Sequence, residues 1–318
     1  MMYDLMALGE VLIDFTQAGV SADGQRLFEQ NPGGAVANVL ALAANCGLMT
    51  AMLGKVGKDM HGAFLRDTLK NAGISTEYLM ETIDAFTTLA FVALAESGER
   101  TFSFARKPGA DTLLREEELP DIRTKVFHIG SLSLTAEPSR TATLTALRRA
   151  KEAGAVISYD PNYRAPLWES REAAVEWMRA PLPYVELMKL SDEETELLTG
   201  LAAPEDAAKA LCAMGIPCVA VTLGAKGALV CVGGKCAIVE GFPANAVDTT
   251  GAGDAFWGGF LTQFIQGGKA PAELTLEDSV RYARWANAAA SLCVRKRGAI
   301  PAMPTSAEVD ALLREYGV

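Results

Sequence analysis

The chain has 318 residues, of which 50% are hydrophobic and 21% are charged, a composition typical of a globular protein and not of a disordered, collagen-like or coiled-coil chain. The 39 aspartates and glutamates outnumber the 29 lysines and arginines, which gives a net charge of −10. The chain therefore lacks an overall positive field, so we expect neither nucleic acid nor a membrane surface as a partner.

The six cysteines form no C-x-x-C pair, and the chain is long enough to build a core without disulfides. We therefore expect reduced, mostly buried thiols in a cytoplasmic protein. Residues 1–4 place no basic stretch before the first apolar run, so we expect no signal peptide.

Two early segments, at about residues 11–30 and 86–106, alternate apolar and polar residues as strands do. They predict a small separate β layer that acts as a lid over one end of a larger sheet. Residues 33–54 between them carry no formal charge, but Asn38 and a turn at 45–47 favour a helix and a short strand over a membrane span.

From residue 126 onward, apolar runs alternate with helix-like segments, which implies parallel strands joined by crossover helices. The expected strands are residues 126–129, 156–159, 185–190 and 218–223. The expected helices are residues 139–153, 170–179, 192–199 and 204–214. Ser139 is the expected N-cap of the first helix, and Gly233-Gly234 predicts an antiparallel hairpin that makes the sheet mixed. We see no repeat or long linker, so we expect one domain over residues 1–318.

The most informative motif is the Asp-Thr-Thr-Gly-Ala-Gly-Asp run at residues 248–254, which is followed by an apolar helix. Glycines before a helix leave backbone N–H groups and the positive end of the helix dipole open to an anion. A carboxylate there, Asp254, suits a base that takes a proton from a hydroxyl attacking a bound phosphoryl group. The alternative is that Asp254 favours the helix dipole and the glycines form a turn. Neither the P-loop pattern nor G-x-G-x-x-G occurs.

Residues 248–254 resemble the C-terminal signature of the ribokinase-like (PfkB) carbohydrate kinases, and residues 33–38 resemble their N-terminal signature. Matches from residues 9–10 to residues 297–299 extend the resemblance over nearly the whole chain. The resemblance implies an α/β fold, with a three-layer α/β/α domain, a mostly parallel central sheet and a small β-sheet lid. It also implies transfer of a phosphoryl group from ATP, with Mg²⁺, to a sugar or nucleoside hydroxyl.

The resemblance assigns roles around the transferred group. Asp254 looks like the catalytic base, and the anion hole looks like the backbone of Gly251, Ala252 and Gly253. Asp248 and Thr250 resemble a monovalent-cation site, so K⁺ is a further expected cofactor.

On the sugar side, Asp14 ends a predicted strand, where ligand crevices of α/β sheets open, and the matching residue of similar kinases binds sugar hydroxyls. Asn38 offers an amide that both donates and accepts, and it follows Gly33 and Gly34. Arg164 lies in an Asp-Pro-Asn-x-Arg run that similar kinases carry at the active site. The alternatives are a cap or loop carboxylate for Asp14, a helix cap for Asn38 and turns at the glycines and at residues 160–164.

On the nucleotide side, Glu194 matches the glutamate of an N-x-x-E motif that organises Mg²⁺ and its waters. Ser191 replaces the usual asparagine, and Ser191 with Glu194 also reads as a capping box. Asn287 aligns with a position that lines the adenine pocket, with a packed helix residue as the alternative. Thr222, Gly224 and Gly227 resemble the nucleotide phosphate loop of the family. The alternative for these three residues is a strand-to-hairpin turn.

Residues 99–111 and 128–134 resemble bacterial fructokinases. Phe102 and Phe104 suit one apolar face of a lid strand, and Arg106 is expected to reach an oxygenated ligand, unless this is a solvated edge strand. Ala105 replaces a frequent aromatic residue. We therefore expect an ATP-dependent fructokinase that makes fructose 6-phosphate.

The alternatives within the class are 2-keto-3-deoxygluconate kinase, whose acid substrate suits Arg106 and Arg164, and ribokinase. A sugar-binding regulator without catalytic activity is the alternative from another class. Exposed apolar strand faces on the lid predict a homodimer.

Overall fold

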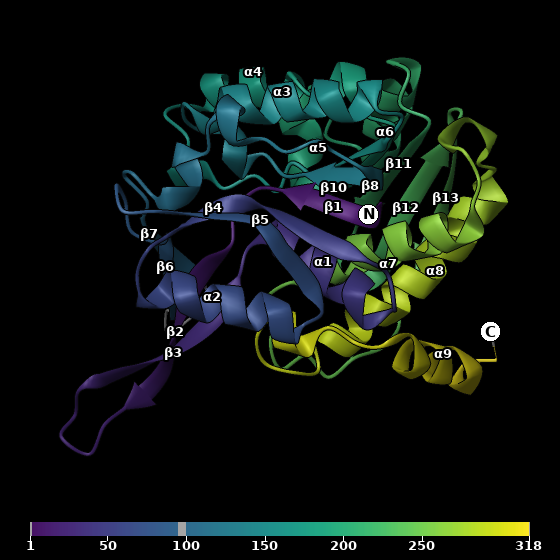
Figure 1. Cartoon of the computed structure of the whole chain (residues 1–318). Helices are drawn as coiled ribbons and strands as arrows, with labels where there is room; N and C mark the ends of the chain where they lie inside the picture. The colour runs from purple at the N-terminus through teal and green to yellow at the C-terminus, as the bar shows by residue number, and fades with distance from the viewer. Residues whose placement is uncertain (1, 95–99, 318) are drawn as a thin grey trace.

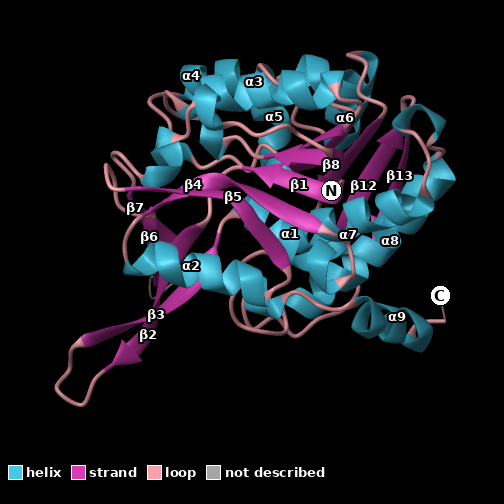
Figure 2. Cartoon of the chain, in the orientation of Figure 1, coloured by secondary structure: helices cyan, strands magenta, loops and turns pink. Residues whose placement is uncertain are grey.

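The computed structural model describes residues 2–94 and 100–317, and side chains outside residues 93–102. Its strands form two sheets, which Figures 1 and 2 show on different sides of the molecule. The larger sheet has nine strands in the order β13-β12-β11-β10-β9-β8-β1-β4-β5. These strands are β1 (Tyr3–Leu8), β4 (Thr50–Gly57), β5 (Ile74–Thr82), β8 (Thr124–Ile129), β9 (Val156–Tyr159), β10 (Leu187–Ser191), β11 (Cys218–Thr222), β12 (Gly227–Val232) and β13 (Lys235–Glu240).

The strands from β5 to β11 in this order pair in parallel, and the hairpin β12–β13 adds an antiparallel edge. The predicted mixed, mostly parallel sheet is confirmed. Its central strands are apolar on both faces because helices cover both sides.

Helices cover the larger sheet on both faces (Figure 2). They are α1 (Ala35–Asn45), α2 (Met60–Asn71), α3 (Ser139–Glu152), α4 (Arg171–Arg179), α5 (Asp192–Thr199), α6 (Pro204–Ala213), α7 (Ala252–Gly267), α8 (Leu276–Cys293) and α9 (Ser306–Glu315). Alternate residues of β1 enter different cores: Leu5 belongs to the core that includes residues of α1, α7 and α8, whereas Met6 belongs to the core that includes residues of α3, α4 and α6. This division gives the expected three-layer α/β/α arrangement.

The second sheet has four strands in the order β3-β2-β6-β7. They are β2 (Leu12–Val20), β3 (Arg26–Gly33), β6 (Leu89–Leu94) and β7 (Arg100–Ala105). They come from the two segments expected to form a separate β layer, although β3 continues past the first segment to Gly33. The hairpin β2–β3 extends away from the main body (Figure 1). Its root is buried at Ile13, whereas Val20 near its tip is exposed.

The uncharged residues 33–54 form α1 and β4, as expected. No helix within the described residues is long and apolar enough to cross a membrane. The expected N-cap role of Ser139 is wrong, since Pro138 occupies that position. The Ser139 hydroxyl instead donates to the carbonyl oxygens of Ser133 and Ala136, which ties α3 to the preceding loop.

The expectation of six reduced thiols is wrong for one pair. Cys231 on β12 and Cys236 on β13 lie directly opposite in the hairpin, with Cα atoms 4.1 Å apart, and they form a disulfide. Sequence spacing did not reveal this pair, because only the strand register brings the two side chains together. Cys46, Cys212, Cys218 and Cys293 are free thiols.

Candidate active site

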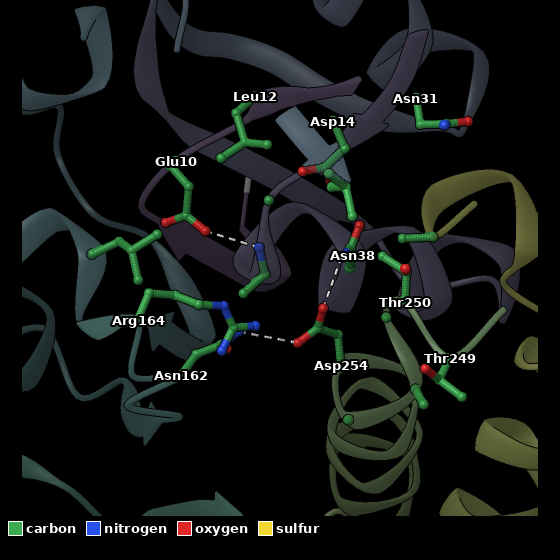
Figure 3. Close-up of a pocket in the computed structure, with 18 of the residues that line it drawn as sticks. Glu10, Leu12, Asp14, Asn31, Asn38, Asn162, Arg164, Thr249, Thr250 and Asp254 are labelled. Carbon is green, nitrogen blue, oxygen red and sulfur yellow. Dashed lines mark hydrogen bonds between the residues drawn. The ribbon is translucent and has the colours of Figure 1, made fainter. Parts of the chain in front are cut away.

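A cavity of about 370 Å³ opens at the carboxyl ends of the parallel strands, beside the second sheet. Glu10 and Asn162 follow β1 and β9, while Ser191 and Thr222 end β10 and β11, and all four residues line the cavity. Residues far apart in the sequence meet here because parallel strands place their carboxyl ends at one edge of the sheet. Figure 3 shows how the side chains of this cavity face one another.

Asp254 lies in the first turn of α7 and is 8% exposed. The Asn38 amide donates to its Oδ2 atom at 2.7 Å, and the Asn162 amide donates to its Oδ1 atom at 3.4 Å (Figure 3). Burial raises the pKa of Asp254, while Lys189 and the Asn38 amide oppose this shift. The two amides hold the carboxylate in one orientation inside the cavity.

The N-terminus of α7 leaves little room for a side chain. Gly251 has a φ of 78°, and a Cβ there would lie 2.9 Å from the Ala299 Cβ atom, so a larger residue would be strained and crowded. Gly251, the N-cap residue, has no side chain to cap this helix, and the Ala252 N–H group donates to the Thr249 carbonyl oxygen at 3.3 Å. Gly251, Ala252 and Gly253 line the cavity, so the positive end of the helix dipole lies at its wall.

Asp14 and Arg164 line the cavity on opposite sides (Figure 3). Burial raises the pKa of Asp14 to about 6; the Arg164 charge opposes this rise, and Asp248 and Asp254 add to it. A Cβ at Gly33 would overlap Asp14 Oδ2, so glycine at this position leaves room for the carboxylate. The chain thus places a half-buried carboxylate in the cavity wall, where hydroxyl groups of a ligand can donate to it.

Glu10 is a cavity residue that sequence reasoning did not place in the site. Its Oε1 atom accepts a hydrogen bond from the Ala35 N–H group at 2.8 Å, which anchors the first residue of α1. Its Oε2 atom is buried without a hydrogen-bond partner among the described residues. Burial raises the Glu10 pKa to about 7, and backbone hydrogen bonds oppose that rise.

Lys189 is a second cavity residue that was missed. Its Nζ atom lies 2.8 Å from Asp160 Oδ2, and both side chains are buried. Burial disfavours the ammonium, but the charges of Asp160, Glu194 and Asp254 outweigh burial and raise the Lys189 pKa. A lysine inside the apolar run of β10 was the signal available in the sequence, because a buried ammonium requires a carboxylate partner.

Glu194 ties two loops of the cavity together. Its Oε1 atom accepts from the Tyr163 N–H group at 2.6 Å, and its Oε2 atom accepts from the Ser191 N–H group at 2.7 Å. The latter is the glutamate half of the predicted capping box. On the opposite side, Asp248 Oδ1 accepts from the Thr250 N–H and hydroxyl groups, so the two residues expected to bind a cation lie together.

Most of the residues expected in the site line the cavity. They are Asp14, Gly34, Asn38, Phe104, Arg164, Glu194, Thr222, Asp248, Thr250, Gly251, Ala252, Gly253 and Asp254. The other expected residues do not line it: Gly33, Arg106, Gly224, Gly227 and Asn287. Further lining residues that sequence reasoning did not assign to the site include Leu12, Asn31 and Leu132.

Arg106 was expected to reach an oxygenated ligand, but its guanidinium lies in a buried ion pair, 2.6 Å from Asp111 Oδ2. It also donates to the Leu132 carbonyl oxygen. Asn287 donates to the carbonyl oxygens of Val239 and Glu240, both at 3.0 Å, and so holds α8 against β13. Phe102 was expected on the same face as Phe104, and its side chain is outside the described part of the chain.

Comparison with known proteins identifies the family. Residues 2–306 match the pfkB family of carbohydrate kinases. The chain is 43% identical to probable fructokinase-4 from Arabidopsis thaliana, over 98% of this chain and 96% of that protein. A fructokinase from Xylella fastidiosa with bound ATP is 35% identical, with a TM-score of 0.92 and all of both chains covered. A fructokinase double mutant from Vibrio cholerae O395, bound to fructose, ADP and potassium ion, is 33% identical, with a TM-score of 0.88 and 98% and 99% of the two chains covered.

The chain therefore belongs to the pfkB family of carbohydrate kinases, enzymes that transfer a phosphoryl group to a sugar hydroxyl. The resemblance inferred from the two glycine-rich motifs is confirmed, as is the ribokinase-like fold with its second, smaller sheet.

Proposed function

We propose that this enzyme is an ATP-dependent fructokinase, which transfers the γ-phosphoryl group of ATP to the 6-hydroxyl group of D-fructose. The observation that carries this proposal is the position of Asp254, a buried carboxylate held by two amides at the N-terminus of α7, directly after Gly251, Ala252 and Gly253. The similar proteins named above are fructokinases, and one of them was solved with fructose and ADP.

In this proposal, Asp254 takes the proton of the attacking hydroxyl group, because its carboxylate is fixed inside the cavity. The backbone N–H groups at the start of α7 stabilise negative charge on the transferred group. Asp14 and Asn38 hold other hydroxyl groups of the sugar, and Phe104 supplies an apolar wall. We further propose that the second sheet is a lid of a single domain that spans residues 1–318.

The charge of the cavity favours a neutral sugar over the acid 2-keto-3-deoxygluconate. Acidic side chains that line the cavity, among them Asp14 and Asp248, outnumber its basic side chains, Arg164 and Lys189, so the net charge repels a carboxylate ligand. The Arg106 guanidinium, which would have favoured an acid, is neutralised by Asp111 outside the cavity. Ribokinase activity is the other alternative within the class, and the fructokinases among the relatives favour fructose.

In this proposal the phosphate end of ATP enters the cavity at Thr222, and the rest of the nucleotide lies outside it. Thr222 lines the cavity at the end of β11, near the start of α7. We propose that the backbone around Thr222, Gly224 and Gly227 holds the nucleotide phosphates and that Asn287 lies beside the adenine pocket. When bound, ATP supplies the phosphoryl group and Mg²⁺ neutralises its charge.

Two residue sets fit the ions. Glu194 would hold Mg²⁺ through water, since its carboxylate lies at the cavity edge. Asp248 and Thr250 would hold K⁺, because their oxygen atoms gather at one place and Asp248 Oδ2 also accepts from the Gly298 N–H group at 3.1 Å.

The test is an ADP-release assay with ATP and Mg²⁺ on fructose, 2-keto-3-deoxygluconate, ribose, glucose and adenosine. We expect turnover with fructose, and we expect Asp254→Asn to abolish it while sugar and ATP still bind, since this change removes the base but little volume. Turnover with another acceptor in place of fructose would refute the substrate. Sugar binding by calorimetry without any turnover would instead support a sugar-binding regulator.

We also propose a homodimer in the cytoplasm. The second sheet exposes Val20, Leu27, Phe28 and Phe91, which are 38% to 63% exposed, and a second copy of this sheet would cover them. Four free thiols support a reducing compartment, although the disulfide between Cys231 and Cys236 does not. Analytical ultracentrifugation tests the dimer, and charged substitutions at Leu27 and Phe28 should convert it to a monomer.

A further inference from the structure

Lys189 places a buried positive charge beside the proposed base, and none of the roles proposed above uses it. Its side chain is 6% exposed and its partner Asp160 is 2% exposed. A Cβ added at Gly253 would lie 3.1 Å from Lys189 Nζ, so the ammonium lies next to the backbone that precedes Asp254. Lys189 also lines the cavity.

The strand register explains why Lys189 lies there. β9 and β10 pair in parallel with Met188 opposite Tyr159, so Lys189, which is still paired with Ala220 of β11, lies beside Asp160, the first residue after β9. Asp160 also accepts a hydrogen bond at its Oδ1 atom from the Asn162 N–H group, at 3.2 Å. Asn162 has a φ of 47°, an uncommon backbone conformation, and its side chain contacts Asp254. The ammonium and the base therefore belong to one connected set of polar groups.

Most groups around Asp254 are acidic. The charged and titratable neighbours on the elements packed against it are Lys189 of β10, Asp160 after β9, Arg164 in the following loop, Glu194 of α5, Asp14 of β2 and the Cys293 thiol of α8. The carboxylates favour the protonated form of Asp254, as do the phosphates of a bound nucleotide. Arg164 opposes them from an exposed position, where solvent screens its charge, whereas Lys189 opposes them from inside the protein.

We propose that Lys189 is a positioning residue for phosphoryl transfer: held by Asp160, its ammonium keeps Asp254 ionised while phosphates are bound beside it. This inference rests on the proposed function, in which Asp254 is the base. A base must be ionised before it accepts the hydroxyl proton, so the charge of Lys189 sets the lower end of the pH range in which the enzyme works.

The alternative is that Lys189 and Asp160 form a structural pair that joins β9 to β10. The two explanations predict different pH profiles for two single variants, Lys189→Met and Asp160→Asn. The acidic limb is the part of the pH profile in which kcat falls as the pH is lowered. If the pair is structural, both variants break it, and the acidic limb moves in the same direction in both variants or does not move. If Lys189 acts on Asp254, the limb moves in opposite directions, because one variant removes a positive charge and the other a negative one.

The experiment measures kcat from about pH 5 to about pH 9, a range that brackets the acidic limb. Fructose, ATP and Mg²⁺ are saturating throughout. We expect Lys189→Met to move the acidic limb upward by about one pH unit, so that kcat below the limb falls about tenfold. We expect Asp160→Asn to move the limb downward. Lys189→Arg keeps the charge and should retain the limb of the unmodified enzyme. Limbs that move together, or do not move, overturn the proposal.

A second variant keeps the test decisive if Lys189→Met fails to fold because it leaves Asp160 buried and unpaired. The double variant Lys189→Met/Asp160→Asn carries no unpaired charge, and it is compared with Asp160→Asn alone. We expect its acidic limb to lie above that of Asp160→Asn, and equal limbs overturn the proposal.

The unmodified enzyme separates the two hypotheses: no turnover with fructose defeats the proposed function, whereas normal turnover with unmoved limbs defeats the role of Lys189 alone.

Discussion

The buried ion pair between Arg106 and Asp111 offers a direct test of what this arginine does. Arg106 Nη2 lies 2.6 Å from Asp111 Oδ2, and both side chains are 3% exposed. The guanidinium also donates to the Leu132 carbonyl oxygen and to the Thr135 hydroxyl group, each at 2.8 Å. These contacts join the end of β7 to the segment before α3, so they fix the root of the second sheet on the main body.

Arg106→Met removes all of these bonds and leaves Asp111 as a buried carboxylate that keeps the Thr88 hydroxyl group as a donor. Breaking one side of a buried pair costs about 3 to 5 kcal/mol, a large part of the roughly 5 to 15 kcal/mol that stabilises a typical domain. Removing both charges in Arg106→Met/Asp111→Leu should cost less than the sum of the single changes, by about 2 kcal/mol.

Urea unfolding measures these free energies, and calorimetry of fructose binding at a temperature where each variant is folded measures the ligand role. We expect unchanged fructose affinity in Arg106→Met. Arg123→Met is the matched control, because its partner Asp121 lies 3.7 Å away and both side chains are largely exposed; it should leave stability unchanged. A stable Arg106→Met variant with fructose affinity reduced tenfold or more would refute the structural role and restore Arg106 to the sugar site.

Three further predictions concern Asp14, the cation and Gly227. Burial raises the Asp14 pKa to about 6, so folding favours the protonated form of this carboxyl group. The free energy of unfolding should therefore fall as the pH rises from about 4 to about 6. In urea titrations, that fall should be smaller by up to about 3 kcal/mol in Asp14→Asn, which cannot ionise. Replacing K⁺ with Na⁺ at fixed ionic strength should lower kcat; equal rates would withdraw the cation role of Asp248 and Thr250. Gly227 has a φ of 104°, and a Cβ there would overlap the Val239 carbonyl oxygen, so Gly227→Ala should lower the melting temperature. Gly234 has a similar φ but lies in open space, so Gly234→Ala should lower the melting temperature less.

Local patterns were sufficient for much of the fold. The apolar run at residues 156–159 and the acidic segment 192–199 before Gly200 were predicted with the bounds observed for β9 and α5, because strand burial and helix capping depend on neighbouring residues. Ser139 shows the limit of this reasoning. Its hydroxyl group bonds to Ser133 and Ala136, and the shape of the preceding loop decided those partners.

Local sequence was sufficient to predict which groups gather at the start of α7. The glycines and Asp254 lie within one short segment, and a strand-to-helix turn of that composition leaves N–H groups and a carboxylate at one place whatever surrounds it. The two signature motifs also identified the family without any knowledge of contacts, because each consists of consecutive residues.

The partners of the buried charges could not be predicted from local sequence. Lys189 and Asp160 are 29 positions apart, and Asn38 and Asp254 are 216 positions apart, so strand register and helix packing bring each pair together. Two pairs that are only five positions apart, Arg106 with Asp111 and Cys231 with Cys236, depend instead on how one loop and one hairpin fold. Long-range electrostatic partners depend on distances between separate elements, and those distances are set by how the apolar faces pack rather than by the local order of residues.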